Sequence, residues 1–196
     1  MSSPATPQRI ALTPGARRAL EAASRLFYER GIHAVGVDLI AAEAGVTKKT
    51  LYDRFGSKEQ LVVEYLAARD ERWRAFLAER MGTAGPTAAE RVVAVFDASR
   101  EWAGENSGRG CSMVNAHAEI SDPNHPAYAI ITGQKAWMLS LFTTLAREAR
   151  PAADYEALGR TLMLIHEGAL VAHGLNVFPD ALGAAREQAR SLLAPP

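Results

Sequence analysis

The chain has few of the features that mark membrane, secreted or disordered proteins. Its 196 residues include one cysteine, Cys111, which excludes an internal disulfide framework and is typical of a reducing compartment. No apolar run approaches the roughly 20 residues that span a bilayer. The first residues also lack the apolar stretch of a signal peptide. We therefore expect a cytoplasmic protein that has no membrane partner.

The chain also lacks a net charge, because 22 basic side chains balance 22 acidic ones. The two signs are distributed unevenly, however. Residues 1–60 carry nine Lys and Arg against six acidic residues, whereas residues 61–196 carry 13 against 16. A small basic end on an acidic body is compatible with nucleic-acid binding, because phosphate contacts need only a local cluster of cations. Charge alone does not establish such binding.

Apolar residues recur at spacings of three and four along nearly the whole chain, and no alternating strand pattern competes with them. The spacing predicts an all-α fold of about nine helices. Thr13 and Thr47 are predicted N-caps. Two capping boxes are also predicted, one formed by Thr87 with Glu90 and the other by Ser57 with Gln60. The helices are expected at about 14–31, 38–44, 47–55, 57–81, 87–105, 111–120, 126–150, 153–174 and 179–193.

The most informative stretch consists of two short helices joined by Gly45 and Val46, which is the type of tight turn found in a helix-turn-helix. Gly45 can adopt the positive φ that such a turn requires. On the second helix Leu51 and Phe55 are expected to point inward. The residues left on the open side are Lys48, Lys49, Thr50, Tyr52 and Asp53. By composition alone, this surface is equally typical of a solvated helix end.

The order of residues favours DNA binding. The segment 40–61, IAAEAGVTKKTLYDRFGSKEQL, closely resembles the DNA-binding signature of the TetR family of transcriptional regulators. The upstream segment 22–31, AASRLFYERG, resembles the first helix of that family. The resemblance covers residues 13–66. It implies a ligand-responsive DNA-binding regulator, most often a repressor, that has no enzymatic activity and no cofactor and acts as a homodimer on a palindromic operator.

The same resemblance implies which side chains contact DNA. The helix over 47–55 would enter the major groove, and its contacts together with one at the start of the next helix would come from Thr47, Lys48, Lys49, Thr50, Tyr52 and Lys58. The family often has a phosphate-binding threonine at the start of the preceding helix, where this chain has Val37 and Asp38. The expected organisation is a flexible tail over 1–12, a helix-turn-helix domain over 13–66, and a ligand-binding and dimerisation domain over 67–196.

The resemblance also implies that the last two helices form a dimer interface. Each of these helices carries an apolar stripe with small residues that allow close approach. An internal core stripe is the alternative interpretation. The predicted interface residues are Leu158, Leu162, Ile165, Ala169, Ala172, Leu182, Ala185 and Ala189.

An effector pocket is implied between the helices of the C-terminal part. Aromatic and methionine side chains are its candidate lining, with a few polar groups to orient a ligand, although most of them can equally be core residues. The lining favours a small, largely apolar effector. The candidates are Trp102, Met113, Asn115, His117, Tyr128, Trp137, Phe142, Met163, His166 and Phe178.

Two other functional classes are compatible with parts of the sequence. A small all-α enzyme would need a metal or thiol site, and its candidates are Cys111 or the cluster His117, Glu119, Asp122 and His125. That cluster lacks a tight metal-ligand spacing, so no metal is expected. Cys111 is either an inert buried thiol or a redox sensor. The second class is a helical protein-interaction module, against which the exposed lysines of the helix-turn-helix argue. The sequence does not identify the effector or the operator.

Overall fold

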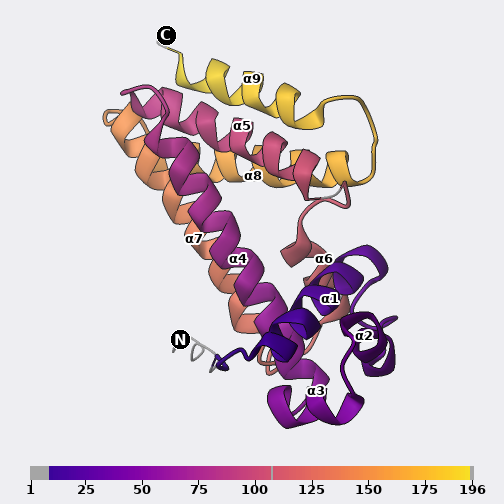
Figure 1. Cartoon of the computed structure of the whole chain (residues 1–196). Helices are drawn as coiled ribbons and strands as arrows, with labels where there is room; N and C mark the ends of the chain where they lie inside the picture. Colours follow the sequence, from indigo (N-terminus) through magenta and orange to yellow (C-terminus); the bar gives the residue numbers. More distant parts are fainter. Residues whose placement is uncertain (1–8, 107, 195–196) are drawn as a thin grey trace. The chain divides into compact units, whose positions relative to one another are not determined.

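The computed structural model describes residues 9–106 and 108–194, and this part of the chain contains nine α-helices and no strand. The all-α prediction is confirmed. In chain order the helices are α1 (Pro14–Arg30), α2 (Val37–Ala44), α3 (Lys48–Phe55), α4 (Lys58–Gly82), α5 (Ala88–Glu105), α6 (Ser112–Glu119), α7 (Tyr128–Ala149), α8 (Tyr155–Gly174) and α9 (Ala181–Leu193) (Figure 1). Within the described residues, no helix combines the length and the apolarity that a membrane span requires.

The predicted helix starts in the first half of the chain are confirmed by their caps. The hydroxyl oxygens of Thr13, Thr47 and Thr87 each accept a hydrogen bond from the backbone N–H three residues later. Glu90 completes the capping box, because its carboxylate accepts from the backbone N–H of Thr87 at 2.9 Å. The Ser57 hydroxyl accepts in the same way at 3.1 Å, at the start of α4. Local polar side chains therefore determine where these helices begin.

The last three helices begin two residues later than the apolar spacing predicts. In α8 and α9 the reason is an aspartate that caps the helix at a later position. The carboxylate of Asp154 accepts from the N–H of Ala157 at 2.9 Å, and that of Asp180 accepts from the N–H of Gly183 at 3.3 Å. Before α7, the ring of His125 accepts from the N–H of Ala127 at 3.1 Å. This local hydrogen bond delays the first helical turn.

The chain divides into two compact units, of which the first contains the described residues 9–71 and 112–134. In this unit α1 packs against α2 and α3, and α2 packs against α3. Its core includes the fully buried side chains of Leu26, Ile40, Leu61 and Leu66. The unit is discontinuous in sequence, because α6 and the first two turns of α7 group with the N-terminal residues. It therefore differs from the contiguous segments expected from the sequence.

The tail expected over residues 1–12 is only partly within the described structure, since residues 1–8 lie outside it. Residues 9 and 10 are held in place rather than free. The Arg9 guanidinium lies 2.7 Å from a carboxylate oxygen of Glu64, and the backbone N–H of Ile10 donates to the other oxygen at 2.9 Å. The side chain of Glu64, on α4, is completely buried. Its contacts with Arg9 and Ile10 therefore hold the segment before α1 against α4.

The second unit contains the described residues 72–106, 108–111 and 135–194. Here α9 packs against both α5 and α8 (Figure 1). Phe96, Met138, Phe142 and Leu162 are fully buried and form the centre of an extended apolar cluster. Because the helices meet through their apolar faces, the inner surface of each is already covered within one chain.

This packing corrects the expected dimer interface. The prediction is wrong for five of its eight residues, because they are buried in the core of a single chain: Leu162, Ala169, Leu182, Ala185 and Ala189. Leu158 and Ile165 pack against the same core, and Ala172 is half-buried. A different apolar stripe on α8 is exposed. The exposed fractions of Leu164, Val171 and Leu175, the last of which directly follows the helix, are 73%, 46% and 71%.

Candidate nucleic-acid interface

The turn between α2 and α3 has the geometry that the sequence predicts. Gly45 adopts a left-handed conformation with φ of 60° and ψ of 41°. Its N–H donates to the carbonyl of Ala42 at 3.2 Å, and the next N–H, of Val46, donates to that of Ala41 at 3.0 Å. These bonds satisfy the last carbonyls of α2 and turn the chain sharply into α3. The two short helices and their turn therefore form a helix-turn-helix.

Helix α3 is anchored by one face and exposes the other. Leu51 and Phe55 are buried, as predicted, with exposed fractions of 3% and 4%. Lys48, Lys49 and Tyr52 lie on the open face and are exposed by 51%, 83% and 44%. The arrangement thus presents two ammonium groups and a phenol on a helix that its own core holds in place.

Both lysines of α3 form ion pairs with aspartates in this structure, a feature that was not among the expected contacts. The Lys48 ammonium lies 3.0 Å from the carboxylate of Asp38 in α2, and that of Lys49 lies 2.7 Å from the carboxylate of Asp53. All four side chains are at least half exposed. Exposed pairs of this kind contribute about 0–1 kcal/mol, so an incoming phosphate can replace them at little cost.

Lys58 is the first residue of α4 and is half-buried. Its ammonium lies 6.0 Å from the centre of the Phe27 ring. Burial lowers the pKa of Lys58 below its usual value, although the negative charge of Glu119 opposes this effect. The side chain is therefore partly desolvated before any ligand approaches. An anion bound near it would stabilise the charged ammonium form.

The start of α2 has no side-chain cap, because Gly36 occupies the N-cap position. Its first backbone N–H groups therefore remain the only donors that the helix start itself supplies to a ligand. The other end of α2 is capped by Arg18, whose Nε donates to the carbonyl of Ala44 at 3.2 Å.

Glu119 supports the helix-turn-helix from a distant part of the sequence. It is the last residue of α6, and its two carboxylate oxygens accept from the backbone N–H groups of Ile32 and His33 at 2.8 and 2.7 Å. These residues follow α1 and begin the connection to α2. One carboxylate therefore satisfies two donors that no helix satisfies. Ile32 and Glu119 are 87 positions apart in the sequence, and no local signal predicts their contact.

We expect the Glu119→Ala substitution to destabilise the protein by about 1–3 kcal/mol, because it leaves two backbone donors without a protein acceptor. Urea denaturation would measure the loss, and hydrogen exchange at the Ile32 amide would locate it. Glu59→Ala is the control, since this glutamate is exposed on α4. Equal stability of the two variants, with unchanged exchange at Ile32, would contradict the supporting role of Glu119.

Comparison with known proteins identifies this arrangement. The sequence model of the family described as "Bacterial regulatory proteins, tetR family" matches residues 19–65. The structure of SCO4454, a TetR-family transcriptional regulator from Streptomyces coelicolor, is similar with a TM-score of 0.79 and 35% sequence identity. That similarity covers 91% of this chain and 92% of the other. The chain belongs to the TetR family. It is thus a TetR-family transcriptional regulator with a DNA-binding domain.

Two further relatives show the range of this family. Regulatory protein TetR from Rhodobacter sphaeroides has a similar fold, with a TM-score of 0.78, 22% identity and coverage of 91% of this chain and 98% of the other. The HTH-type transcriptional activator FasR of Mycolicibacterium smegmatis is 27% identical over 130 residues, which is 66% of this chain. The matched part spans 58% of that relative's length. By their descriptions, these matched proteins are regulatory proteins.

The residues expected to line an effector pocket are distributed over both units of the TetR-family chain. Met113, Asn115, His117 and Tyr128 belong to the first unit, and the other six belong to the second. The structure gives these candidates different surroundings. In the second unit Phe142 and His166 are buried in the core, Trp102, Trp137 and Met163 are half-buried, and Phe178 is 47% exposed after α8. His117 is also exposed, so neither it nor Phe178 lines an enclosed cavity.

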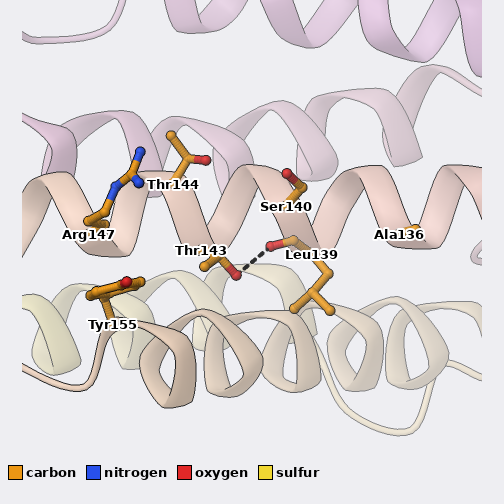
Figure 2. A pocket seen from close by; sticks show the side chains of 7 residues that line it. All are labelled: Ala136, Leu139, Ser140, Thr143, Thr144, Arg147 and Tyr155. Carbon is orange, nitrogen blue, oxygen red and sulfur yellow. Dashed lines mark hydrogen bonds between the residues drawn. The ribbon is translucent and has the colours of Figure 1, made fainter.

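Two surface pockets are present in the second unit, and none of the ten candidates lines either of them. One has a volume of about 290 Å³ and lies along α7 beside the first residue of α8 (Figure 2). The other has a volume of about 410 Å³ and lies between α5 and α9. The first pocket is lined by Ala136, Leu139, Ser140, Thr143, Thr144, Arg147 and Tyr155. The second is lined by Ala89, Glu90, Val93, Arg186, Arg190, Leu193 and Ala194.

The groups considered for an enzyme or a metal site have other partners. Glu119 binds two backbone N–H groups, and the Nδ1 atom of His125 accepts from Ala127. In residues 9–106 and 108–194, no three His, Cys, Asp or Glu side chains gather in a way that could hold a metal ion. Ser99 and His166 form a 2.8 Å hydrogen bond, but both are buried, so a substrate cannot reach the hydroxyl.

Proposed function

We propose that this protein is a ligand-responsive repressor that binds a palindromic operator as a homodimer. The observation that supports it most directly is α3, which exposes two lysines and a tyrosine on a helix anchored by Leu51 and Phe55. A helix of this kind fits the major groove of B-DNA. In a dimer, two copies of α3 would read half-sites about one helical turn apart.

Each predicted DNA contact has a chemical role in this proposal. Lys48 and Lys49 bind phosphates or the acceptor atoms of guanine, after releasing their aspartate partners. The hydroxyls of Thr47 and Thr50 lie 2.9 Å apart, so one DNA acceptor can interact with both. Tyr52 and Lys58 bind phosphates on either side of the groove. The uncapped N–H groups of α2 add a phosphate contact that needs no side chain.

The exposed stripe of α8 is the dimer interface in this proposal, and its occupant is a second copy of the chain. Leu164, Val171 and Leu175 follow one another at spacings of seven and four, so they share one side of the helix. Gly168 lies between them and is also exposed, which allows a partner helix to approach closely. An isologous interface of this kind is self-complementary, as a two-fold operator requires.

The effector in this proposal is a small, largely apolar molecule that binds in the second unit. Half-buried aromatic and thioether side chains favour such a ligand, and here they include Trp102, Trp137 and Met163. The effector releases the operator only if it binds more tightly to the arrangement of the dimer that cannot contact DNA. The direction of regulation depends on where the operator lies relative to the promoter.

A gel-shift assay with the DNA upstream of the protein's own gene tests the proposal. At roughly 150 mM salt and with excess non-specific DNA, we expect a competitor-resistant complex. Small apolar compounds can then be screened for release of that complex. If the upstream DNA gives no such complex, selection from random duplexes follows. The absence of any enriched palindrome in that selection would overturn the proposal.

We expect Asp53→Asn to increase operator affinity by about threefold to tenfold, because it frees Lys49 and removes a negative charge from the DNA-facing helix. Fluorescence anisotropy with labelled operator would measure the change. Glu156→Gln is a matched control, since Glu156 also forms an (i,i+4) pair, with Arg160, but in the second unit. Weaker binding by Asp53→Asn than by the control would mean that the Asp53 carboxylate itself contacts DNA favourably.

A further inference from the structure

The pocket on α7 contains a positive charge that no group in the described part of the chain neutralises. Arg147 is exposed, and it makes no hydrogen bond or ion pair to any residue in 9–106 or 108–194. The neighbouring carboxylate of Glu148 is engaged with the guanidinium of Arg91. None of the seven residues that line the pocket is acidic (Figure 2). The guanidinium of Arg147 is therefore open to an anion from solution.

Three hydroxyl groups around the same pocket are also uncommitted. A hydroxyl within a helix commonly donates to the carbonyl four residues earlier, and that of Thr143 does so, at 2.8 Å from the carbonyl oxygen of Leu139 (Figure 2). Ser140 and Thr144 lie on the same helix, but their hydroxyls make no hydrogen bond to any described residue. The same holds for the hydroxyl of Tyr155. The pocket thus offers free O–H donors beside a free cation.

Small side chains on α7 and a close crossing of α8 create the hollow. Ala136, Ser140 and Thr143 recur at spacings of four and three, so they share one side of α7. A Cβ atom on Gly159 of α8 would lie 2.6 Å from Oγ1 of Thr143 and 2.7 Å from its Cα. Because only glycine fits at this crossing, the two helices are held against each other. Tyr155 lies one turn before Gly159 and lines the pocket on the side of α8.

The polar and apolar groups of the pocket lie on different edges of α7. In the view of Figure 2, Arg147, Thr144 and Ser140 lie on one edge of the helix. Leu139 and the ring of Tyr155 lie on the other edge. Leu139 is 37% exposed, so its side chain forms an open apolar wall. A ligand that covers the pocket therefore meets hydrogen-bond donors along one side and carbon atoms along the other.

This arrangement selects the chemistry of a ligand. A guanidinium matches a carboxylate in charge and in geometry, because both groups form two parallel hydrogen bonds. The pocket has one cation, so a phosphate monoester with two negative charges would keep one of them unpaired. An aromatic ring can stack on Tyr155 and cover Leu139. The volume of about 290 Å³ is at the lower end of the range for small-molecule sites, which favours a compact ligand.

We propose that this pocket binds a small aromatic carboxylate. The carboxylate lies on the guanidinium of Arg147 and accepts from the hydroxyl of Thr144, and the ring covers the small residues of α7 towards Leu139. The site shares no residue with the apolar effector site of the proposed function, whose lining includes Trp102, Trp137 and Met163. It does not depend on DNA binding, and Arg147 is not a DNA contact.

Binding can be measured directly with 2-naphthoate, by following the backbone amide signals of the full-length protein in NMR spectra. We expect saturable shifts centred on residues 139–147, with a dissociation constant of roughly 0.1–1 mM for a ligand of this size. The neutral isostere 2-naphthamide should bind at least about tenfold more weakly, because it cannot pair with the guanidinium. Shifts confined to other helices, or equal affinity for the two compounds, would overturn the site.

Substitutions of Arg147 test the role assigned to its guanidinium. We expect Arg147→Met to weaken naphthoate binding by at least about tenfold, and Arg147→Lys by about threefold, since lysine keeps the charge but loses the planar fork. Arg160→Met is the matched control, because Arg160 is also an exposed arginine of the second unit and lies outside the pocket. Wild-type affinity in Arg147→Met, or an equal loss in Arg160→Met, would contradict the proposal.

The hydroxyls and the choice of anion are tested separately. The double variant Ser140→Ala/Thr144→Ala should bind naphthoate about threefold to tenfold more weakly, because two donors are lost. 2-Naphthyl phosphate carries close to two negative charges at neutral pH and should bind more weakly than naphthoate. Tighter binding of the phosphate would overturn the assignment of a carboxylate. Since no measurement here uses DNA, failure of the protein to bind any operator would leave the result for this pocket unchanged.

Discussion

Operator affinity is expected to fall by about 100-fold at roughly 150 mM salt when Lys48 and Lys49 are both replaced by alanine. A dimer would lose four ammonium groups, each worth about 1 kcal/mol at a phosphate or base edge. In the wild type, part of the binding free energy of these contacts is offset, because Lys48 and Lys49 must first release Asp38 and Asp53. The net loss is therefore smaller than four undisturbed contacts would give.

The salt dependence of binding gives an independent measurement of the same contacts. Affinity falls as salt rises, and each phosphate contact contributes about 0.9 to the magnitude of the slope of log affinity against log salt. Losing four contacts should therefore reduce the magnitude of that slope by about 3–4. Arg100→Ala/Arg147→Ala is the matched control, because it removes two exposed charges from the second unit. Unaltered affinity and slope in the Lys48/Lys49 variant, with normal helicity and dimerisation, would remove both residues from the interface.

The helix-turn-helix could be predicted from sequence because its determinants are local. Thr47 caps α3 within three residues, and Gly45 satisfies the end of α2 within its own turn. Leu51 and Phe55 lie one helical turn apart, so their spacing alone indicates the buried face. The ion pair between Lys49 and Asp53 is also local, since the two residues are four positions apart on one helix.

The long-range contacts of the structure could not be predicted in the same way. Glu119 binds backbone N–H groups 86 and 87 residues earlier, and any residue can supply such groups, so the sequence carries no mark of the pairing. Lys135 meets Glu167 across 32 residues and Cys111 across 24. Each residue alone is typical of a solvated or inert position. Only the packing of the second unit brings them within bonding distance.

The error in the dimer interface has a specific cause. Helix α8 carries apolar residues on more than one side, with Leu162 and Ala169 on one and Leu164 and Val171 on another. Periodicity identifies such stripes but does not say which one the rest of the chain covers. In the structure α9 packs against α8 and buries the stripe with the small residues. The stripe that contains Leu164 is left for another partner.

We expect Leu164→Glu to raise the dimer dissociation constant by at least about 100-fold, which corresponds to about 2.7 kcal/mol. Leu164 is 73% exposed in one chain, so the substitution should leave the monomer fold intact. In a two-fold interface, however, each dimer would bury two carboxylates without partners, and that desolvation is costly. Light scattering during size-exclusion chromatography would show monomers at micromolar concentration, and operator affinity would fall with them.

The control for this prediction is Leu139→Glu, which makes the same change at an exposed leucine on α7. If apolar exposure alone drives association, both variants should dissociate alike. If the α8 stripe is the interface, Leu164→Glu and Leu175→Glu should dissociate and Leu139→Glu should not. A dimer that survives Leu164→Glu with unchanged affinity would show that another surface joins the two chains. The spacing of the two α3 helices on DNA would then have to be derived from that surface instead.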